Sequence, residues 1–299
     1  MVPWWRRGPA LWTASAGETE QVRQLLEKKV DIEEIGGELK TTPLHQAALR
    51  GHEQIALLLL EHKANVSAKD IDGNTPLTYA ASKGRETVAL LLIEHKADVS
   101  AQDHTGGTAL SWAAGEGQET VVWLLIAHQA DVSSQGTSGG IALLVAAYEG
   151  HEAVVRLLIE HQADVSFKGP TEGTALLNAS SGGHEAVVRL LLDAGADVAV
   201  KDNDGLSALH HAALNGEEGT VRMLMDAGAD EQSQANDGRT PKDEAYLEAH
   251  FQVAAMLKAE GVRRAKWVAF AMGHHARLGV ESPVGELDAG VVRMVLEQV

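Results

Sequence analysis

The chain has 299 residues, no cysteine and a formal net charge of −17. The absence of cysteine excludes disulfides, thiolate catalysis and Cys-based zinc sites, and it suits a reducing compartment. Of 25 basic and 42 acidic residues, five and four lie in residues 262–299, which leaves 20 and 38 in residues 1–261. Such an acidic surface disfavours nucleic acid and anionic membranes, so we expect a partner protein with a basic surface.

The N-terminal residues do not have the pattern of a signal peptide. The first twelve residues, MVPWWRRGPALW, lack the apolar core of a signal peptide, and no apolar run in the chain reaches the ~18 residues of a membrane span. We therefore expect a cytoplasmic or nuclear protein. Residues 1–8 are interpreted as an N-terminal arm, in which Trp4 and Trp5 either fold back onto the first helix pair or form a docking motif.

One stretch, residues 42–73, contains the signals of a helix–turn–helix–hairpin unit. Thr42 is a suitable helix N-cap and Pro43 suits the first helical position. Gly51 permits a reversal, and apolar residues then recur at helical spacing from residue 55. Asp70–Gly73 has the residue types of a type I turn.

The same unit recurs every 33 residues without insertion or deletion. Its register positions are Thr42, Thr75, Thr108, Ile141, Thr174, Ser207 and Thr240. The sequences that begin at these positions are TPLHQAA, TPLTYAA, TALSWAA, IALLVAA, TALLNAS, SALHHAA and TPKDEAY. This period, with the pattern T-P-L-H-x-A, resembles the ankyrin-repeat family over about residues 9–261.

The resemblance implies an all-α solenoid of about eight stacked helix–turn–helix–hairpin units. Residues 9–40 and the unit at Thr240 are expected to be polar caps, and residues 262–299 a helical C-terminal tail. The resemblance further implies a monomeric, non-catalytic scaffold for protein–protein binding, without a cofactor. It does not identify the partner, because the ligand of such a scaffold varies freely.

Two features depart from the family pattern. A glycine usually precedes the Ala-Asp pair after the second helix, where the backbone turns left-handed. Gly195 and Gly228 follow this pattern, whereas four other units have Lys63, Lys96, Gln129 and Gln162. The hairpins at 136–140 and 169–173 lack the usual turn residues, so we expect the middle of the stack to open first.

Several patterns that suggest catalysis or metal binding are better explained by the repeat. The pairs His52-Glu53, His151-Glu152 and His184-Glu185 lack the second histidine of a zinc peptidase. The sequence at 136–140 fits G-x-S-x-G but lies on a hairpin rather than between a strand and a helix. A row of histidines at the ends of the second helices is spaced too widely to share an ion; its members are His62, His95, His128 and His161. We therefore expect no catalytic or metal site.

The resemblance implies binding through the hairpin tips and the exposed face of the first helix of each unit. The candidate residues on the helix face are Tyr79, Lys83, Trp112, Glu116, Tyr148, Glu149 and His211. Those at the tips are Ile71, Asp72, Asn74, His104 and Asp204. The three aromatic residues are expected to line one concave strip, and Trp112→Ala to weaken binding with little effect on melting. The alternative is that they pack between repeats.

The last thirteen residues suggest a second function. LDAGVVRMVLEQV resembles the opening helix of an F-box, with Leu287, Val291, Val292, Val295 and Leu296 at its apolar positions. Asp288 and Gly290 depart from the F-box pattern. The resemblance implies a substrate-recruiting adaptor of a ubiquitin ligase; the alternative is an amphipathic cap helix.

Overall fold

The computed structural model describes residues 11–12, 17–133 and 142–259. Within the described residues, an inner row contains α3 (Pro43–Arg50), α5 (Pro76–Ser82), α7 (Ala109–Gly115), α9 (Ala142–Glu149), α11 (Ala175–Ser181), α13 (Ala208–Leu214) and α15 (Pro241–Leu247). An outer row contains α2 (Thr19–Glu27), α4 (Glu53–Glu61), α6 (Glu86–Glu94), α8 (Glu119–Ala127), α10 (Glu152–Glu160), α12 (Glu185–Asp193) and α14 (Glu218–Asp226). A last helical stretch covers residues 251–259. The N-terminal arm, the G-x-S-x-G hairpin and the F-box-like residues lie outside the described residues.

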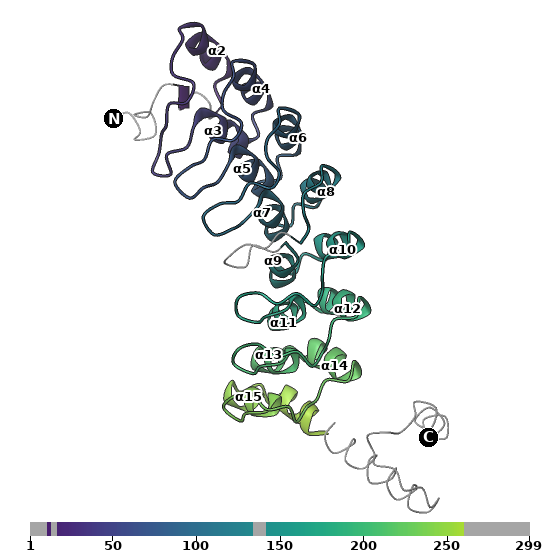
Figure 1. The fold of residues 1–299 in the computed structure, drawn as a ribbon. Helices are drawn as coiled ribbons and strands as arrows, with labels where there is room; N and C mark the ends of the chain where they lie inside the picture. The colour runs from purple at the N-terminus through teal and green to yellow at the C-terminus, as the bar shows by residue number, and fades with distance from the viewer. Residues whose placement is uncertain (1–10, 13–16, 134–141, 260–299) are drawn as a thin grey trace, which may run out of the picture.

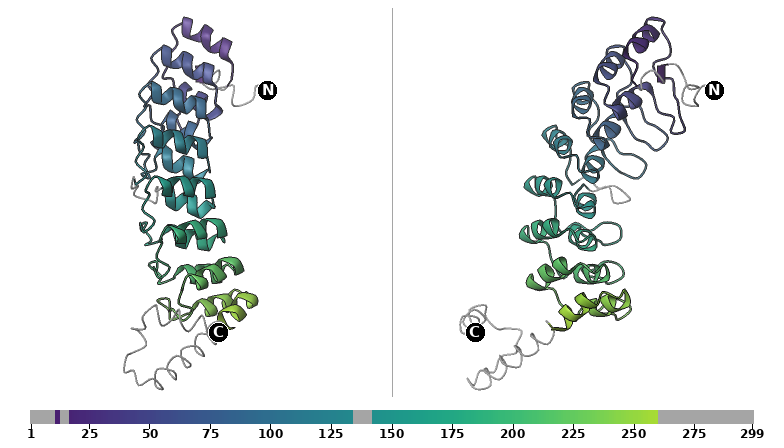
Figure 2. Two further views of the ribbon diagram at one scale, coloured as in Figure 1. Left: turned by 90° about the vertical axis from the view of Figure 1, so that its right-hand side faces the viewer. Right: turned by 180° about the vertical axis from the view of Figure 1, so that it is seen from behind.

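The two rows of helices stack into a curved solenoid, as predicted from the repeat. The outer helices lie on the convex side, and the inner helices with their hairpins lie on the concave side (Figure 1). Two further views show neighbouring helices of each row side by side along the stack (Figure 2). In the described part of the chain, β-pairing is limited to isolated bridges such as Gln102 with Thr108. The all-α prediction is therefore confirmed.

The inner helices begin at the predicted caps. Thr42, Thr75 and Thr108 have extended backbones and precede α3, α5 and α7. The Thr108 hydroxyl accepts the Ser111 amide at 3.3 Å, which satisfies one of the free N–H groups at the helix start. The unit at Thr240 repeats this contact through the Asp243 amide.

The core is built from equivalent positions in successive repeats. The outer helices bury leucines at equivalent positions, including Leu59, Leu92 and Leu125. The inner helices bury alanine pairs such as Ala113 and Ala114, whose small side chains allow close helix packing. Because each unit can bury this surface only against its neighbours, the repeats are stable as an array.

Hydrogen bonds connect successive repeats. His45 Nδ1 accepts the Thr42 amide at 3.1 Å, so the other ring nitrogen, Nε2, carries the proton and donates to the Asn74 carbonyl at 3.1 Å. His210 makes the same pair of contacts, with Ser207 and Arg239. The two histidines therefore link the caps of their own helices to the hairpins of the next repeat. Burial lowers the pKa of both rings, although the carbonyl hydrogen bonds oppose it.

The four non-glycine residues at the ends of the outer helices have the left-handed backbone predicted for them. Their φ angles are 67° at Lys63, 68° at Lys96, 66° at Gln129 and 65° at Gln162. Gly195 and Gly228, at the equivalent positions, have φ angles of 87° and 91°. The chain therefore keeps one geometry at these six helix ends, with glycine at only two of them.

Candidate functional site

An aspartate in three of the hairpins, buried in the first two and partly buried in the third, positions a side chain on the following inner helix. Asp70 accepts the Tyr79 hydroxyl at 2.7 Å, and Asp103 accepts the Trp112 indole N–H at 2.8 Å. Asp202 makes the equivalent contact with His211 Nε2 at 2.8 Å. From the sequence, Asp70 was predicted only to start a turn, and its contact with the following helix was missed. A spacing of nine residues from Asp to Tyr, Trp or His is the signal that would have predicted the contact.

Asp103 accepts hydrogen bonds both from its own hairpin and from the following helix. Its Oδ1 accepts the amides of Thr105 and Gly107 at 2.7 and 2.9 Å, while its Oδ2 accepts the indole of Trp112. Although burial raises the pKa of Asp103, the hydrogen bonds from Thr105, Trp112 and Gly107 lower it overall. A Cβ at Gly107 would lie 2.6 Å from Asp103 Oδ2 and 2.9 Å from Trp112 Nε1. Glycine is therefore needed at this position for the carboxylate and indole to meet.

Nine of the twelve candidate residues are exposed, and three are half-buried, namely Tyr79, His211 and Asn74. Tyr79 differs most from the expectation of a free contact residue. Burial and the hydrogen bond to Asp70 raise the pKa of its hydroxyl, and its ring meets that of His45 edge-on at 5.6 Å. Tyr79 is therefore partly a packing residue, as the alternative interpretation held, because its polar end is already bonded.

Trp112 combines both roles. It is 41% exposed, so the ring is available to a partner, but most of its surface is buried and its N–H is bonded to Asp103. The sequence-based expectation that Trp112→Ala hardly affects melting assumed an exposed residue outside the core, whereas more than half of this side chain is buried. Truncation removes both buried apolar surface and a hydrogen bond to a charged group.

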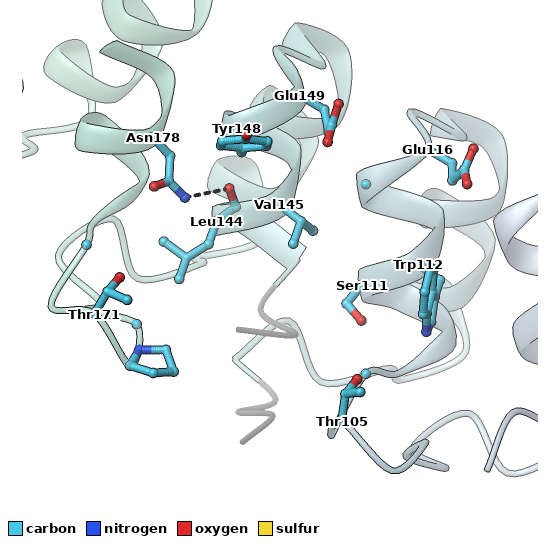
Figure 3. Close-up of a pocket in the computed structure, with 15 residues that line it drawn as sticks. Thr105, Ser111, Trp112, Glu116, Leu144, Val145, Tyr148, Glu149, Thr171 and Asn178 are labelled. Atoms are coloured by element: carbon cyan, nitrogen blue, oxygen red, sulfur yellow. Dashed lines mark hydrogen bonds between the residues drawn. The ribbon is translucent and has the colours of Figure 1, made fainter. Parts of the chain in front are cut away.

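An open groove lies between the inner helices α7 and α9. Its volume is about 890 Å³, and it extends to the hairpin at 169–173 and to α11. Trp112 and Glu116 come from α7, Tyr148 and Glu149 come from α9, and Asn178 from α11 donates to the Leu144 carbonyl at 3.1 Å (Figure 3). The groove brings together four of the predicted contact residues from two repeats.

Equivalent positions on this part of the concave face carry one basic side chain followed by two acidic ones. Lys83 and Glu116 occupy equivalent positions on α5 and α7, with Lys83 Nζ 3.5 Å from Glu116 Oε1. Glu149 occupies the same position in the next repeat, and among the described residues it has no ion-pair partner. The carboxylates of Glu116 and Glu149 lie at the same end of their two helices (Figure 3).

A family model for ankyrin repeats, described as three copies, matches the chain in overlapping segments. The matched residues are 10–103, 68–136, 96–169, 143–235 and 176–263. The chain belongs to the ankyrin-repeat family. The predicted register of 33 residues and the observed helix pairs agree with this assignment.

Similarity to curated proteins covers a short part of this ankyrin chain. It is 44% identical over 62 residues to the palmitoyltransferase AKR1 of Lachancea kluyveri, which is 21% of this chain and 8% of that protein. Over the same length it is 37% identical to the palmitoyltransferase ZDHHC13 of Mus musculus and 36% to the palmitoyltransferase Hip14 of Drosophila melanogaster, each 10% covered. The chain thus matches about a tenth or less of these relatives, so their named activity does not transfer to it.

Exposed aromatic residues of the ankyrin stack also occur away from the groove. Trp123 on the outer helix α8 is 58% exposed, close to the 59% of Tyr148. Trp123 is not among the predicted contact residues, because those lie on the hairpin tips and the exposed face of the inner helices. The pair provides a matched comparison between the two faces of the stack.

The predicted row of histidines lies at the ends of α4, α6, α8 and α10, where all four side chains are exposed. Three of them bond to a carbonyl of their own helix, as His62 Nδ1 does to Leu58 at 2.8 Å. No group of three His, Asp or Glu side chains within residues 17–133 and 142–259 is arranged to hold a metal ion. No helix in the described part of the chain is long and apolar enough to cross a membrane.

Proposed function

We propose that this ankyrin stack is a scaffold that binds a partner protein through its concave face. Ankyrin repeats mediate protein–protein interactions, and the observation that supports this particular face is the groove between α7 and α9 with two exposed aromatic side chains. Tyrosine and tryptophan are favoured anchors of protein interfaces because they bury a large, rigid surface. The exposed hairpin tips, including Ile71, His104 and Asp204, extend the surface on one side.

The net charge supports a partner with a basic surface. Residues 1–261 contain 18 more acidic than basic residues, and Glu116 and Glu149 place carboxylates beside the aromatic groove. Long-range attraction accelerates association with a basic protein and is screened by salt. We therefore expect the association rate constant to fall steeply as salt is added, with a smaller change in the dissociation rate constant.

The experiment compares two truncations with similar exposure on opposite faces. Proteins retained from source-cell extract by the intact chain are quantified and compared with those retained by Tyr148→Ala and Trp123→Ala. Loss of a specific set of proteins with Tyr148→Ala alone supports binding at the concave face. Loss with Trp123→Ala alone would assign binding to the convex face and contradict the proposal. Circular dichroism of both variants serves as the folding control.

A further inference from the structure

We propose that the groove between α7 and α9 binds an arginine side chain carried on an extended segment of the partner. This inference rests on the proposed function and names the chemistry of the ligand. The site consists of Trp112 and Tyr148 as aromatic surfaces and Glu149 as the anionic group, with Glu116 beside it. A groove of about 890 Å³ is within the size range of ligand-binding clefts.

The indole of Trp112 is held in a defined orientation before any ligand arrives. Its N–H bonds to Asp103 Oδ2 at 2.8 Å, and Asp103 is itself held by the amides of Thr105 and Gly107. A ring fixed in this way loses little conformational entropy on binding. The remaining 41% of its surface is available for a flat cation to stack on.

The carboxylate of Glu149 distinguishes this groove from a purely apolar one. The side chain is exposed and has no ion pair among the described residues, whereas Glu116 is within 3.5 Å of Lys83. An arginine guanidinium satisfies both kinds of group, because it is planar, stacks on aromatic rings and donates a fork of hydrogen bonds to a carboxylate. A lysine ammonium lacks the planar surface, so we expect arginine to be preferred.

Gly115 keeps the groove open. It lies on α7 one residue before Glu116, at the position that Tyr148 occupies in the next repeat. A Cβ at Gly115 would lie 3.6 Å from Val145 Cγ2, which is an ordinary contact distance. Gly115→Ala is therefore expected to fold at least as well as the native chain, and Gly115→Leu to fill the groove without removing any group that holds the fold.

The test uses a displayed library of random short peptides, selected against the full chain. Arginine is expected to be enriched at one position. A selected peptide, fluorescently labelled, should bind about tenfold more weakly to Glu149→Gln and ~30-fold more weakly to Gly115→Leu by fluorescence polarisation. Replacing its arginine with glutamine should weaken binding to the native chain more than binding to Glu149→Gln, because the charge interaction is already lost in that variant. Replacing it with lysine should weaken binding to both, because the planar stacking surface is lost. The matched control is Glu160→Gln, at the end of the outer helix α10, which should bind normally.

Other results overturn the inference in distinguishable ways. Peptides that lack arginine but lose binding with Gly115→Leu would leave the proposed concave-face function standing and refute the arginine assignment. Peptides whose binding is unaffected by both Gly115→Leu and Tyr148→Ala would contradict the groove as a site. The absence of any enriched peptide would refute the arginine site, while the extract experiment would still test the scaffold. Intact circular dichroism of Gly115→Leu excludes unfolding as the cause of a loss.

Discussion

The left-handed ends of the outer helices allow a stringent test of how backbone strain affects stability. The perturbation is replacement by glycine at four positions with φ between 65° and 68°, namely Lys63, Lys96, Gln129 and Gln162. Replacing an L-residue in this conformation with glycine relieves roughly 1–2 kcal/mol of strain in the folded state. Glycine is also more flexible in the unfolded chain, which lowers the net stabilisation by about 0.5–1 kcal/mol. Each replacement is therefore expected to stabilise the fold by about 0.5–1 kcal/mol.

The surrounding geometry indicates that the stability change at each helix end comes from the backbone of the replaced residue alone. The amide of the left-handed residue donates to an equivalent carbonyl in both kinds of unit. Lys63 bonds to Leu60 at 2.9 Å, and Gly195 bonds to Leu192 at 2.9 Å. A Cβ added at Gly195 or Gly228 meets nothing within 4 Å, so the reverse substitutions introduce backbone strain without a steric clash. Gly195→Lys and Gly228→Lys should therefore each destabilise the stack by about 0.5–1 kcal/mol.

The assay is urea unfolding followed by circular dichroism, with the midpoint and slope compared among variants. Because the four sites lie in different repeats, their effects should add to about 2–4 kcal/mol in the quadruple glycine variant. The matched control replaces the same residues with alanine, which removes the long side chains but keeps the Cβ and should be nearly neutral. Glycine variants no more stable than their alanine counterparts, or a harmless Gly195→Lys, would refute the strain argument.

Three further predictions concern stability elsewhere in the stack. Burial lowers the pKa values of His45 and His210, so the stability that the neutral rings contribute is complete above the unfolded pKa of about 6.5. As pH falls below that value, this stability is lost by up to about 1.4 kcal/mol per pH unit for each ring. Replacing both histidines with threonine, the residue at the equivalent position 78, should therefore flatten the dependence of the unfolding free energy on pH between 7.5 and 5, and an unchanged profile would contradict this. Gly169 stands at the position that Asp202 occupies in the next hairpin, where the aspartate accepts the amides of Asp204 and Leu206. The amides of residues 171 and 173 lack such an acceptor and should exchange hydrogen faster than those of Asp204 and Leu206. Greatest protection across residues 130–180 would contradict this. Trp112→Ala should lower the free energy of unfolding by about 2–3 kcal/mol, because the side chain is 41% exposed and truncation removes roughly 100 Å² of buried apolar surface. A decrease below ~1 kcal/mol in urea unfolding would show that the buried part contributes little.

The repeat architecture could be predicted from the sequence alone, because the features that indicate it depend on local interactions. The threonine caps, the helix-end residues with positive φ and the apolar spacing depend on interactions within a few residues. Repetition then multiplies these signals, since seven copies in one register leave little freedom for another fold. The exposed row of histidines was predictable for the same reason, whereas the contact of His45 with Asn74 joins residues of two different repeats.

The tertiary structure decided which of the surface residues form a site. Tyr79 and Trp112 occupy equivalent positions and were given equal roles from the sequence, yet one is half-buried and the other retains an exposed ring. The groove beside Trp112 depends on Gly115 of one repeat and Val145 and Tyr148 of the next, so no single repeat contains it. Exposure and concavity depend on how neighbouring units pack against each other, and a one-dimensional pattern does not record this packing.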